Sequence, residues 1–134
     1  MTKEEIITKV KGLNMPRGSY VVFGSGPLVV AGIRLAQDID LYVTKEVQKQ
    51  KLKEGWQFVN KGGKDIPLTH DVFEMHTNWD FSSYNPSLAD LLSTAAIVDG
   101  VAFASLDEVR KWKVVSARPK DLADIILIDG YFKS

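Results

Sequence analysis

The stretch of sequence that decides the expected fold covers residues 20–43 and reads YVVFGSGPLVVAGIRLAQDIDLYV. Its first four residues are β-branched or aromatic, which predicts a strand over 20–23 that ends at the glycines that follow. Pro27 suits a first helical position, so a short helix should run from there to Ile33. The stretch therefore predicts a strand, a tight turn, a helix and then a second strand.

The second expected strand, over residues 38–43, carries two carboxylates. Its residues alternate with period two, so Asp38 and Asp40 should share one face. Mg²⁺ prefers hard oxygen ligands, and paired carboxylates hold the two ions of phosphoryl-transfer sites. The pattern therefore indicates a metal site, although an isolated pair of this kind is also typical of the solvated face of an amphipathic strand.

The turn Gly24-Ser25-Gly26 is a candidate phosphate site. It should stand at a helix N-terminus, where unpaired backbone N–H groups and a partial positive charge favour anions. Glycines let a phosphate approach the backbone, and the Ser25 hydroxyl adds a donor. Taken alone, however, this sequence is more often a plain tight turn.

Cap residues and apolar spacing predict further elements on both sides of this stretch. Helices are expected from Thr2 to about residue 13, from Thr44 to Glu54, after Ser87, after Ser105 and from Pro119, the last one burying Leu122, Ile125 and Ile126. The sequence also predicts a strand over 56–60, a turn at Lys61-Gly62-Gly63-Lys64 and a long extended run from Ile66 to Met75. A further hairpin turn is expected at Asp99-Gly100. On the extended run, Glu74 and Asp71 should face opposite ways.

Composition limits the possible function classes. The chain has 134 residues, enough for a single domain spanning 1–134, and its 17 basic residues balance its 17 acidic ones. No global field therefore attracts nucleic acid or anionic membrane. The absence of cysteine excludes disulfides, thiolate metal sites and a thiol nucleophile. With no leader-like or membrane-spanning run, a soluble, cytoplasmic protein without membrane partners is expected.

Two motifs in order resemble a known family. The first runs Val21-Val22-Phe23-Gly24-Ser25, then Gly32-Ile33-Arg34, then Asp38-Ile39-Asp40-Leu41. The second has Lys113 followed by Arg118-Pro119-Lys120-Asp121-Leu122-Ala123-Asp124. Together they resemble the nucleotidyltransferases of the DNA polymerase β-like superfamily, in particular small bacterial members related to aminoglycoside and lincosamide adenylyltransferases. The similarity extends from about Tyr20 to the C-terminus.

The resemblance implies an α+β (mixed α/β) fold, with a mixed sheet flanked by helices, and transfer of a nucleoside monophosphate from a nucleoside triphosphate, expected to be ATP, to an acceptor hydroxyl. Mg²⁺ or Mn²⁺ would be the cofactor. It assigns Gly24 and Ser25 to the triphosphate and Asp38 and Asp40 to the metals. The third carboxylate, which would ligate a metal and take the acceptor's proton, should be Glu74, with Asp71 as the fallback, although the family usually has Asp there.

Three basic residues complete the candidate site. Arg34 either contacts the triphosphate or neutralises the nearby aspartates. Lys113 and Lys120 either reach phosphates or are solvated charges of terminal helices. Asp121 and Asp124 are expected to cap the last helix rather than to bind metal.

The acceptor and the assembly are left open by the sequence. The acceptor is a small molecule, a protein or an RNA. Residues 125–132 carry more apolar side chains than one buried stripe needs, which predicts a homodimer with a shared acceptor cleft, the alternative being burial of both sides within one chain. The competing function is a non-catalytic module of the same fold that binds a nucleotide or a partner, as in toxin–antitoxin pairs.

Overall fold

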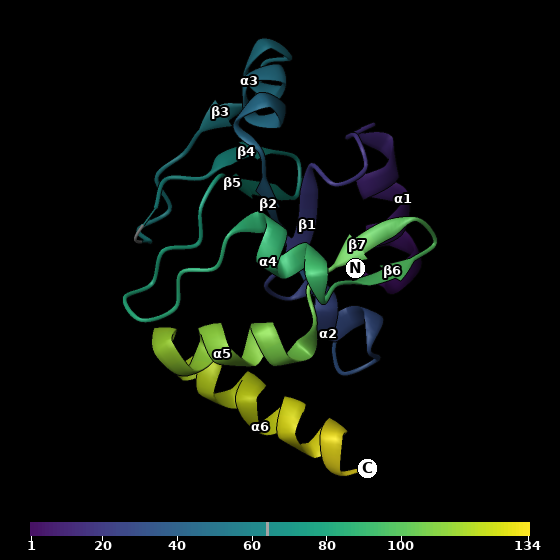
Figure 1. Ribbon diagram of the computed structural model, residues 1–134, viewed down its shortest axis with the longest axis vertical. Helices are drawn as coiled ribbons and strands as arrows, with labels where there is room; N and C mark the ends of the chain where they lie inside the picture. The colour runs from purple at the N-terminus through teal and green to yellow at the C-terminus, as the bar shows by residue number, and fades with distance from the viewer. Residues whose placement is uncertain (64) are drawn as a thin grey trace.

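The computed structural model describes residues 1–63 and 65–134; Lys64, the last residue of the expected 61–64 turn, lies outside the described residues. The described residues form six helices and one seven-stranded mixed sheet (Figure 1). The strand order is β3-β4-β5-β2-β1-β7-β6. The expected α+β class, a mixed sheet flanked by helices, is confirmed.

The centre of the sheet is built from the stretch at residues 20–43. β1 (Tyr20–Phe23) and β2 (Ile39–Val43), the two strands expected there, pair antiparallel. β5 (Phe73–His76) adds in parallel to β2, and β7 (Val101–Phe103) adds in parallel to β1. All four residues of β1 are buried, because this strand lies between two others and helices cover it on both sides.

The outer strands pair antiparallel with their neighbours. β3 (Gln57–Phe58) pairs with β4 (Leu68–His70), and β6 (Ala96–Val98) pairs with β7. The β6–β7 turn is formed by Asp99 and Gly100, both with positive φ, as expected for a two-residue hairpin turn.

The prediction of one long extended run from Ile66 to Met75 is wrong. This segment forms two strands, β4 and β5, that pair antiparallel with Thr69 opposite Glu74. The break is at Asp71, which has a φ of 52°. Aspartate tolerates this left-handed conformation, and its side chain favours turns, so the chain reverses there.

Local cap sequences set most helix boundaries. Thr2, Thr44, Ser87 and Ser105 each accept a hydrogen bond from the backbone N–H three residues later, as predicted. The helices are α1 (Lys3–Gly12), α2 (Gly26–Val30), α3 (Lys45–Lys53), α4 (Leu88–Ser93), α5 (Leu106–Ser116) and α6 (Pro119–Lys133).

Helix α2 ends three residues before the expected Ile33. Gly32, with a φ of 77°, stands at the left-handed position after the helix, where its N–H donates to the Val29 carbonyl. The Ile33 N–H donates to the Leu28 carbonyl, which completes a Schellman motif. This stop turns the chain so that Arg34 points back toward the start of α2.

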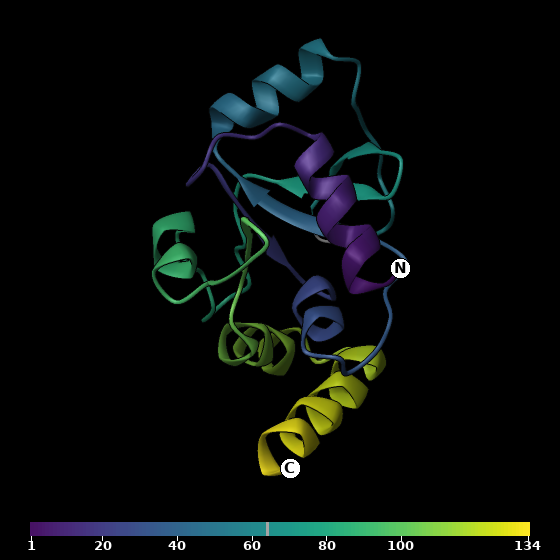
Figure 2. The same ribbon diagram turned by 90° about the vertical axis from the view of Figure 1, so that its right-hand side faces the viewer.

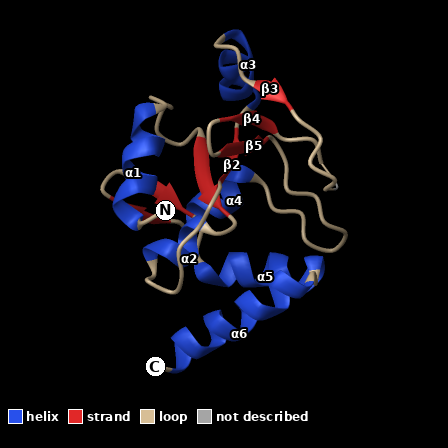
Figure 3. Cartoon of the chain, turned by 180° about the vertical axis from the view of Figure 1, so that it is seen from behind, coloured by secondary structure: helices blue, strands red, loops and turns tan. Residues whose placement is uncertain are grey.

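The helices are distributed around the sheet rather than on one face. Figure 2 shows α1 and α4 on opposite sides of the central strands. Helix α3 lies at one end of the molecule, and the α5–α6 pair lies at the other (Figure 1). Helix α6 packs against α5 and extends away from the sheet to the C-terminus (Figure 3).

Helix α6 does not bury the residues expected. Leu122 and Ile126 are 51% and 72% exposed, and its buried residues are Asp121, Asp124 and Ile128. Apolar side chains occur on almost every side of this helix, so apolar spacing does not identify the inward face. The two buried aspartates are possible because they meet cations of the neighbouring elements, which the next subsection describes.

Candidate functional site

The candidate residues line one cavity of about 970 Å³. It lies where β1, β2 and β5 meet the α5–α6 pair. All eight residues singled out from the sequence line it: Gly24, Ser25, Arg34, Asp38, Asp40, Glu74, Lys113 and Lys120. Segments far apart in the chain therefore bring these residues to one place.

Strand register explains one side of the cavity, the carboxylate wall, which Asp38, Asp40 and Glu74 form. Asp40 on β2 lies directly opposite Glu74 on the parallel strand β5. Both are partly buried, while Asp38 lies exposed just before β2. Parallel neighbours point their side chains to the same face of a sheet, so the two carboxyl groups are adjacent.

The pKa of Asp40 is raised to about 7. Burial contributes most, because it disfavours the charged carboxylate; repulsion from Glu74, a hydrogen bond donated to Glu74 and repulsion from Asp38 add to it. The charge of Lys113 offsets part of the increase. The Asp40 carboxyl group therefore keeps its proton up to about neutral pH beside Glu74.

Asp71, the fallback for the third carboxylate, is not part of this site. It stands on the β4–β5 turn, and its Oδ2 atom lies 2.8 Å from Lys9 Nζ. Asp71 is exposed and does not line the cavity. Of the two candidates, Glu74 is therefore the one that lies beside Asp40 in the cavity.

Position 24 requires a glycine because its backbone lies close to the Asp40 carboxylate. Its φ is 64°, and a Cβ atom there would lie 2.3 Å from Asp40 Oδ2. A side chain would therefore collide with the carboxylate that the β1–β2 register places opposite. The following helix, α2, has only five residues, and Ser25 makes no side-chain cap bond, so the helix N-terminus contributes less than the sequence suggested.

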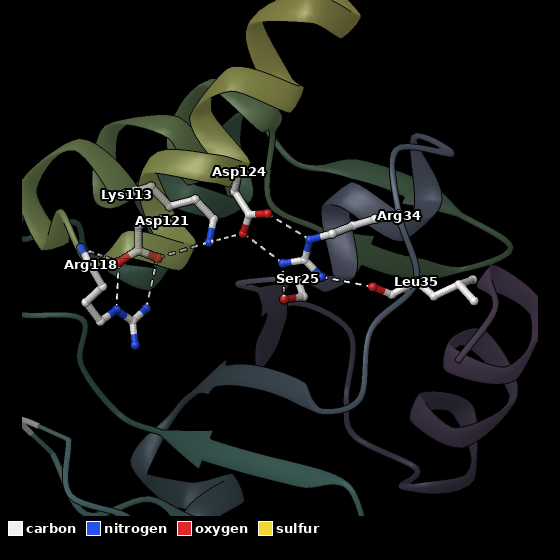
Figure 4. Close-up of polar contacts among 7 residues, drawn as sticks. All are labelled: Ser25, Arg34, Leu35, Lys113, Arg118, Asp121 and Asp124. Carbon is white, nitrogen blue, oxygen red and sulfur yellow. Dashed lines mark hydrogen bonds and ion pairs between the residues drawn. The ribbon is translucent and has the colours of Figure 1, made fainter.

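Arg34 does not pair with Asp38 or Asp40. Its Nε and Nη2 atoms each donate to a different oxygen of Asp124 at 2.8 Å (Figure 4). Nη2 also donates to the Ser25 hydroxyl at 2.8 Å. Arg34 therefore ties the turn after β1 to α6, a role that neither sequence alternative described.

Lys113 is buried rather than solvated, which corrects the expectation for a terminal-helix lysine. Its side chain is 4% exposed, and Nζ lies 2.9 Å from Asp124 and 3.3 Å from Asp121. Arg118 donates to both carboxylate oxygens of Asp121 as well. Lys120, by contrast, is exposed on the rim of the cavity, with its charge toward solvent.

The two aspartates of α6 have different roles. Asp121 caps the helix, as expected, because its Oδ2 accepts from the Arg118 backbone N–H at 3.1 Å. Asp124 does not cap; it pairs with Arg34 and Lys113. Burial alone would raise the pKa of Asp121, but hydrogen bonds from Arg118 and Ser116 and the charge of Lys113 lower it to about 2.

The cavity thus has two walls of opposite charge. Asp38, Asp40 and Glu74 form the carboxylate wall. The cationic wall has Arg34, Lys113, Arg118 and Lys120 against Asp121 and Asp124, which leaves it positive. A ligand that carries both a metal ion and phosphates matches such a charge separation.

Three cavity residues were not assigned to the site from the sequence. Lys61 reaches the carboxylate wall from the β3–β4 connection, and His76 lies on the same side of β5 as Glu74. His76 stands two positions after Glu74 on an alternating stretch, so the sequence carries a signal for its place on that face. Trp112 belongs to an aromatic cluster at the cavity, in which its ring centroid lies 5.2 Å from that of Trp79.

Within residues 1–63 and 65–134, no cluster of three or more His, Cys, Asp or Glu side chains has a metal-binding arrangement. The described residues also include no helix long and apolar enough to cross a membrane. Comparisons with protein-family models, with curated proteins and with solved structures find no match. The function is therefore argued from the cavity itself.

The raised pKa of Asp40 predicts a pH-dependent stability difference for the Asp40→Asn variant. Because the folded state holds the Asp40 proton up to about pH 7 and the unfolded chain only up to its ordinary pKa of 3.8, this group lowers stability as the pH rises through that window. The Asp40→Asn variant should be as stable as the parent at pH 4 and more stable than the parent at pH 8. Thermal unfolding in metal-free buffer measures this, and a difference that is the same at all pH values contradicts the assignment.

The buried ion pairs predict unequal effects of two substitutions in α6. Asp124→Asn leaves Arg34 without a charged partner and the buried Lys113 with Asp121 alone, so it should cost about 3 kcal/mol in the free energy of unfolding. Asp129→Asn breaks an exposed pair with Arg110 of α5 and should cost less than about 1 kcal/mol. Urea unfolding compares them, and equal losses would exclude a structural role for the buried network.

Proposed function

We propose that this protein is a nucleotidyltransferase that transfers a nucleoside monophosphate from a magnesium-bound nucleoside triphosphate to an acceptor hydroxyl. One observation carries the proposal. A carboxylate wall and a cationic wall face each other across one cavity, and the residues of both motifs line it. Metal-assisted phosphoryl transfer needs this combination, because the metal requires hard anionic ligands and the phosphates require cations.

The carboxylate wall fits Mg²⁺ or Mn²⁺ bound together with phosphates. Such an ion takes one or two protein carboxylates and completes its shell with phosphate oxygens and water, so a complete protein cage is not needed. Asp40 and Glu74 are adjacent, and Asp38 stands at the same mouth. Burial and repulsion from Glu74 and Asp38 raise the pKa of Asp40, so added positive charge would favour its ionised form. The ion would supply that charge and polarise the phosphates.

The cationic wall would receive the phosphates. Lys120 and Arg118 are exposed at the cavity and keep donors free to turn toward a ligand. Arg34 and Lys113 are held by Asp124, so their part is to fix the Ser25 hydroxyl and to keep the wall positive. Gly24 leaves the backbone beside Asp40 open to approach.

In the proposed reaction the acceptor oxygen bonds to the α-phosphorus, and the bond from that phosphorus to the pyrophosphate oxygen breaks. The acceptor's proton moves to the Asp40–Glu74 carboxyl pair. A carboxylate held at this position on β5, beside Asp40, is suited to take it as a general base. The position of Glu74 beside Asp40 favours this catalytic function over a non-catalytic binding module.

Metal-dependent nucleotide binding is the first test. The parent should show a rise in melting temperature with a nucleoside triphosphate and Mg²⁺ that neither gives alone, with ATP the expected nucleotide, since linkage stabilises only the form that binds. Asp40→Asn should lose this rise. Asp99→Asn, on the distant β6–β7 turn, should keep it. If Asp40→Asn responds to ATP and Mg²⁺ as the parent does, the metal site is wrong.

The exposed face of α6 supports a homodimer. Leu122, Ile126 and Leu127 lie opposite the buried residues of the helix and are each more than 40% exposed. Ala123 and Gly130 lie between them on the same side, so a second helix can approach closely. The α6 helix of a second copy, packed antiparallel about Ile126, would cover this face. The resulting dimer would contain two cavities, one in each chain.

Light scattering tests the dimer. The parent should show a mass near twice 14.9 kDa at micromolar concentration, and Ile126→Glu should reduce it to the single-chain mass without loss of stability, because Ile126 is 72% exposed. Thr8→Glu, at an exposed position of the distant α1, adds the same negative charge and is the matched control. A parent mass of one chain at all concentrations would exclude the dimer.

A further inference from the structure

Lys61 lies on the carboxylate wall although it belongs to a surface connection. Its Nζ atom is 3.0 Å from Glu74 Oε1. The connection between β3 and β4 turns sharply after Asn60, whose side chain accepts a hydrogen bond from the Gly62 N–H at 2.8 Å. Gly62 has a φ of 84°. The turn therefore directs Lys61 to the cavity that Asp38, Asp40 and Glu74 line.

The Lys61 ammonium stands where positive charge is needed. Among the ion pairs of residues 1–63 and 65–134, the Lys61–Glu74 pair is the one that places a cation directly on this carboxylate group. On the opposite wall, Arg34, Lys113 and Arg118 are held by Asp121 and Asp124, and Lys120 lies on the rim. The hydrogen bond to Glu74 raises the pKa of Lys61 despite the opposing effect of burial, and the charges of Glu74, Asp38 and Asp40 add to the increase.

The Lys61–Glu74 pair is also easy to separate. The Lys61 side chain is 48% exposed, whereas that of Glu74 is 18% exposed. A flexible lysine at the surface gains little net free energy from such a pair, because water stabilises the free ammonium almost as well. Lys61 can leave for solvent, while Glu74 is held on its strand.

We propose that Lys61 is the resident counter-cation of the carboxylate wall, and that a divalent metal ion binds there only by displacing it. This inference rests on the proposed function, since it assumes that the wall accepts a metal ion. It adds a residue that neither motif contains. Before metal arrives, Lys61 would lower the repulsion between the three carboxylates. It would also make the protein bind metal weakly in the absence of a nucleotide.

The experiment measures the affinity for Mn²⁺ alone, by isothermal titration calorimetry on the full chain. Lys61→Met should bind Mn²⁺ roughly tenfold more tightly than the parent, because a competing unit charge at ion-pair distance is gone. Lys61→Gln is a second neutral variant and should behave alike. Lys61→Arg keeps the charge and should keep the parent's affinity.

Lys9→Met is the matched control. Lys9 makes a comparable exposed pair with Asp71 at 2.8 Å, outside the cavity, so this variant removes the same net charge and also breaks a lysine–carboxylate contact. Its affinity for Mn²⁺ should stay within about twofold of the parent's, since charges farther apart than the screening length interact weakly. The comparison separates a direct contact from a change in overall charge.

The outcomes distinguish the two proposals. If the parent binds Mn²⁺ and both neutral Lys61 variants bind it no more tightly, Lys61 does not compete with metal and this inference is overturned alone. A gain in Lys9→Met or Lys61→Arg equal to that in Lys61→Met overturns it as well. If no variant binds Mn²⁺ at millimolar concentration, the role of Lys61 is overturned, and the metal site of the proposed function fails with it only if ATP and Mg²⁺ together also give no rise in melting temperature.

Discussion

The position of β2 between β1 and β5 is the constraint on which the site depends. The antiparallel register with β1 places Asp40 opposite Phe23 and against Gly24, and the parallel register with β5 places it opposite Glu74. A shift of one residue would turn Asp40 toward the core and Leu41 toward the cavity. The buried residues of β2 therefore do more than stabilise the sheet, because their burial fixes where the carboxylates stand.

Much of this arrangement was predictable because it depends on local patterns. The β-branched run before Gly24 and the alternation of Asp38 to Val43 identify the two central strands, and each capped helix begins at its Ser or Thr. The shared face of Asp38 and Asp40 was predictable for the same reason, because alternation along one strand is a short-range property. Glu74 was expected only from the resemblance, and the pairing of its strand with β2 was not predicted.

The parts that were not predictable depend on contacts between distant segments. Nothing near Asp124 in the sequence indicates that Arg34, ninety positions earlier, will pair with it. The same holds for the burial of Lys113, whose type is usually solvated. The break at Asp71 was missed for a different reason, since one residue with positive φ interrupts an alternation that continues on both sides.

Helix α6 shows how these contacts reverse the usual distribution of residues. Its inward side carries Asp121 and Asp124, and its outward side carries Leu122 and Ile126. Buried carboxylates are costly unless cations meet them, so the helix can dock only where Arg34, Lys113 and Arg118 are already in place. The cationic wall and the position of α6 therefore require each other. Because Arg34 also donates a hydrogen bond to Ser25, it links α6 to the turn beside Asp40, and a displacement of α6 would also displace that turn.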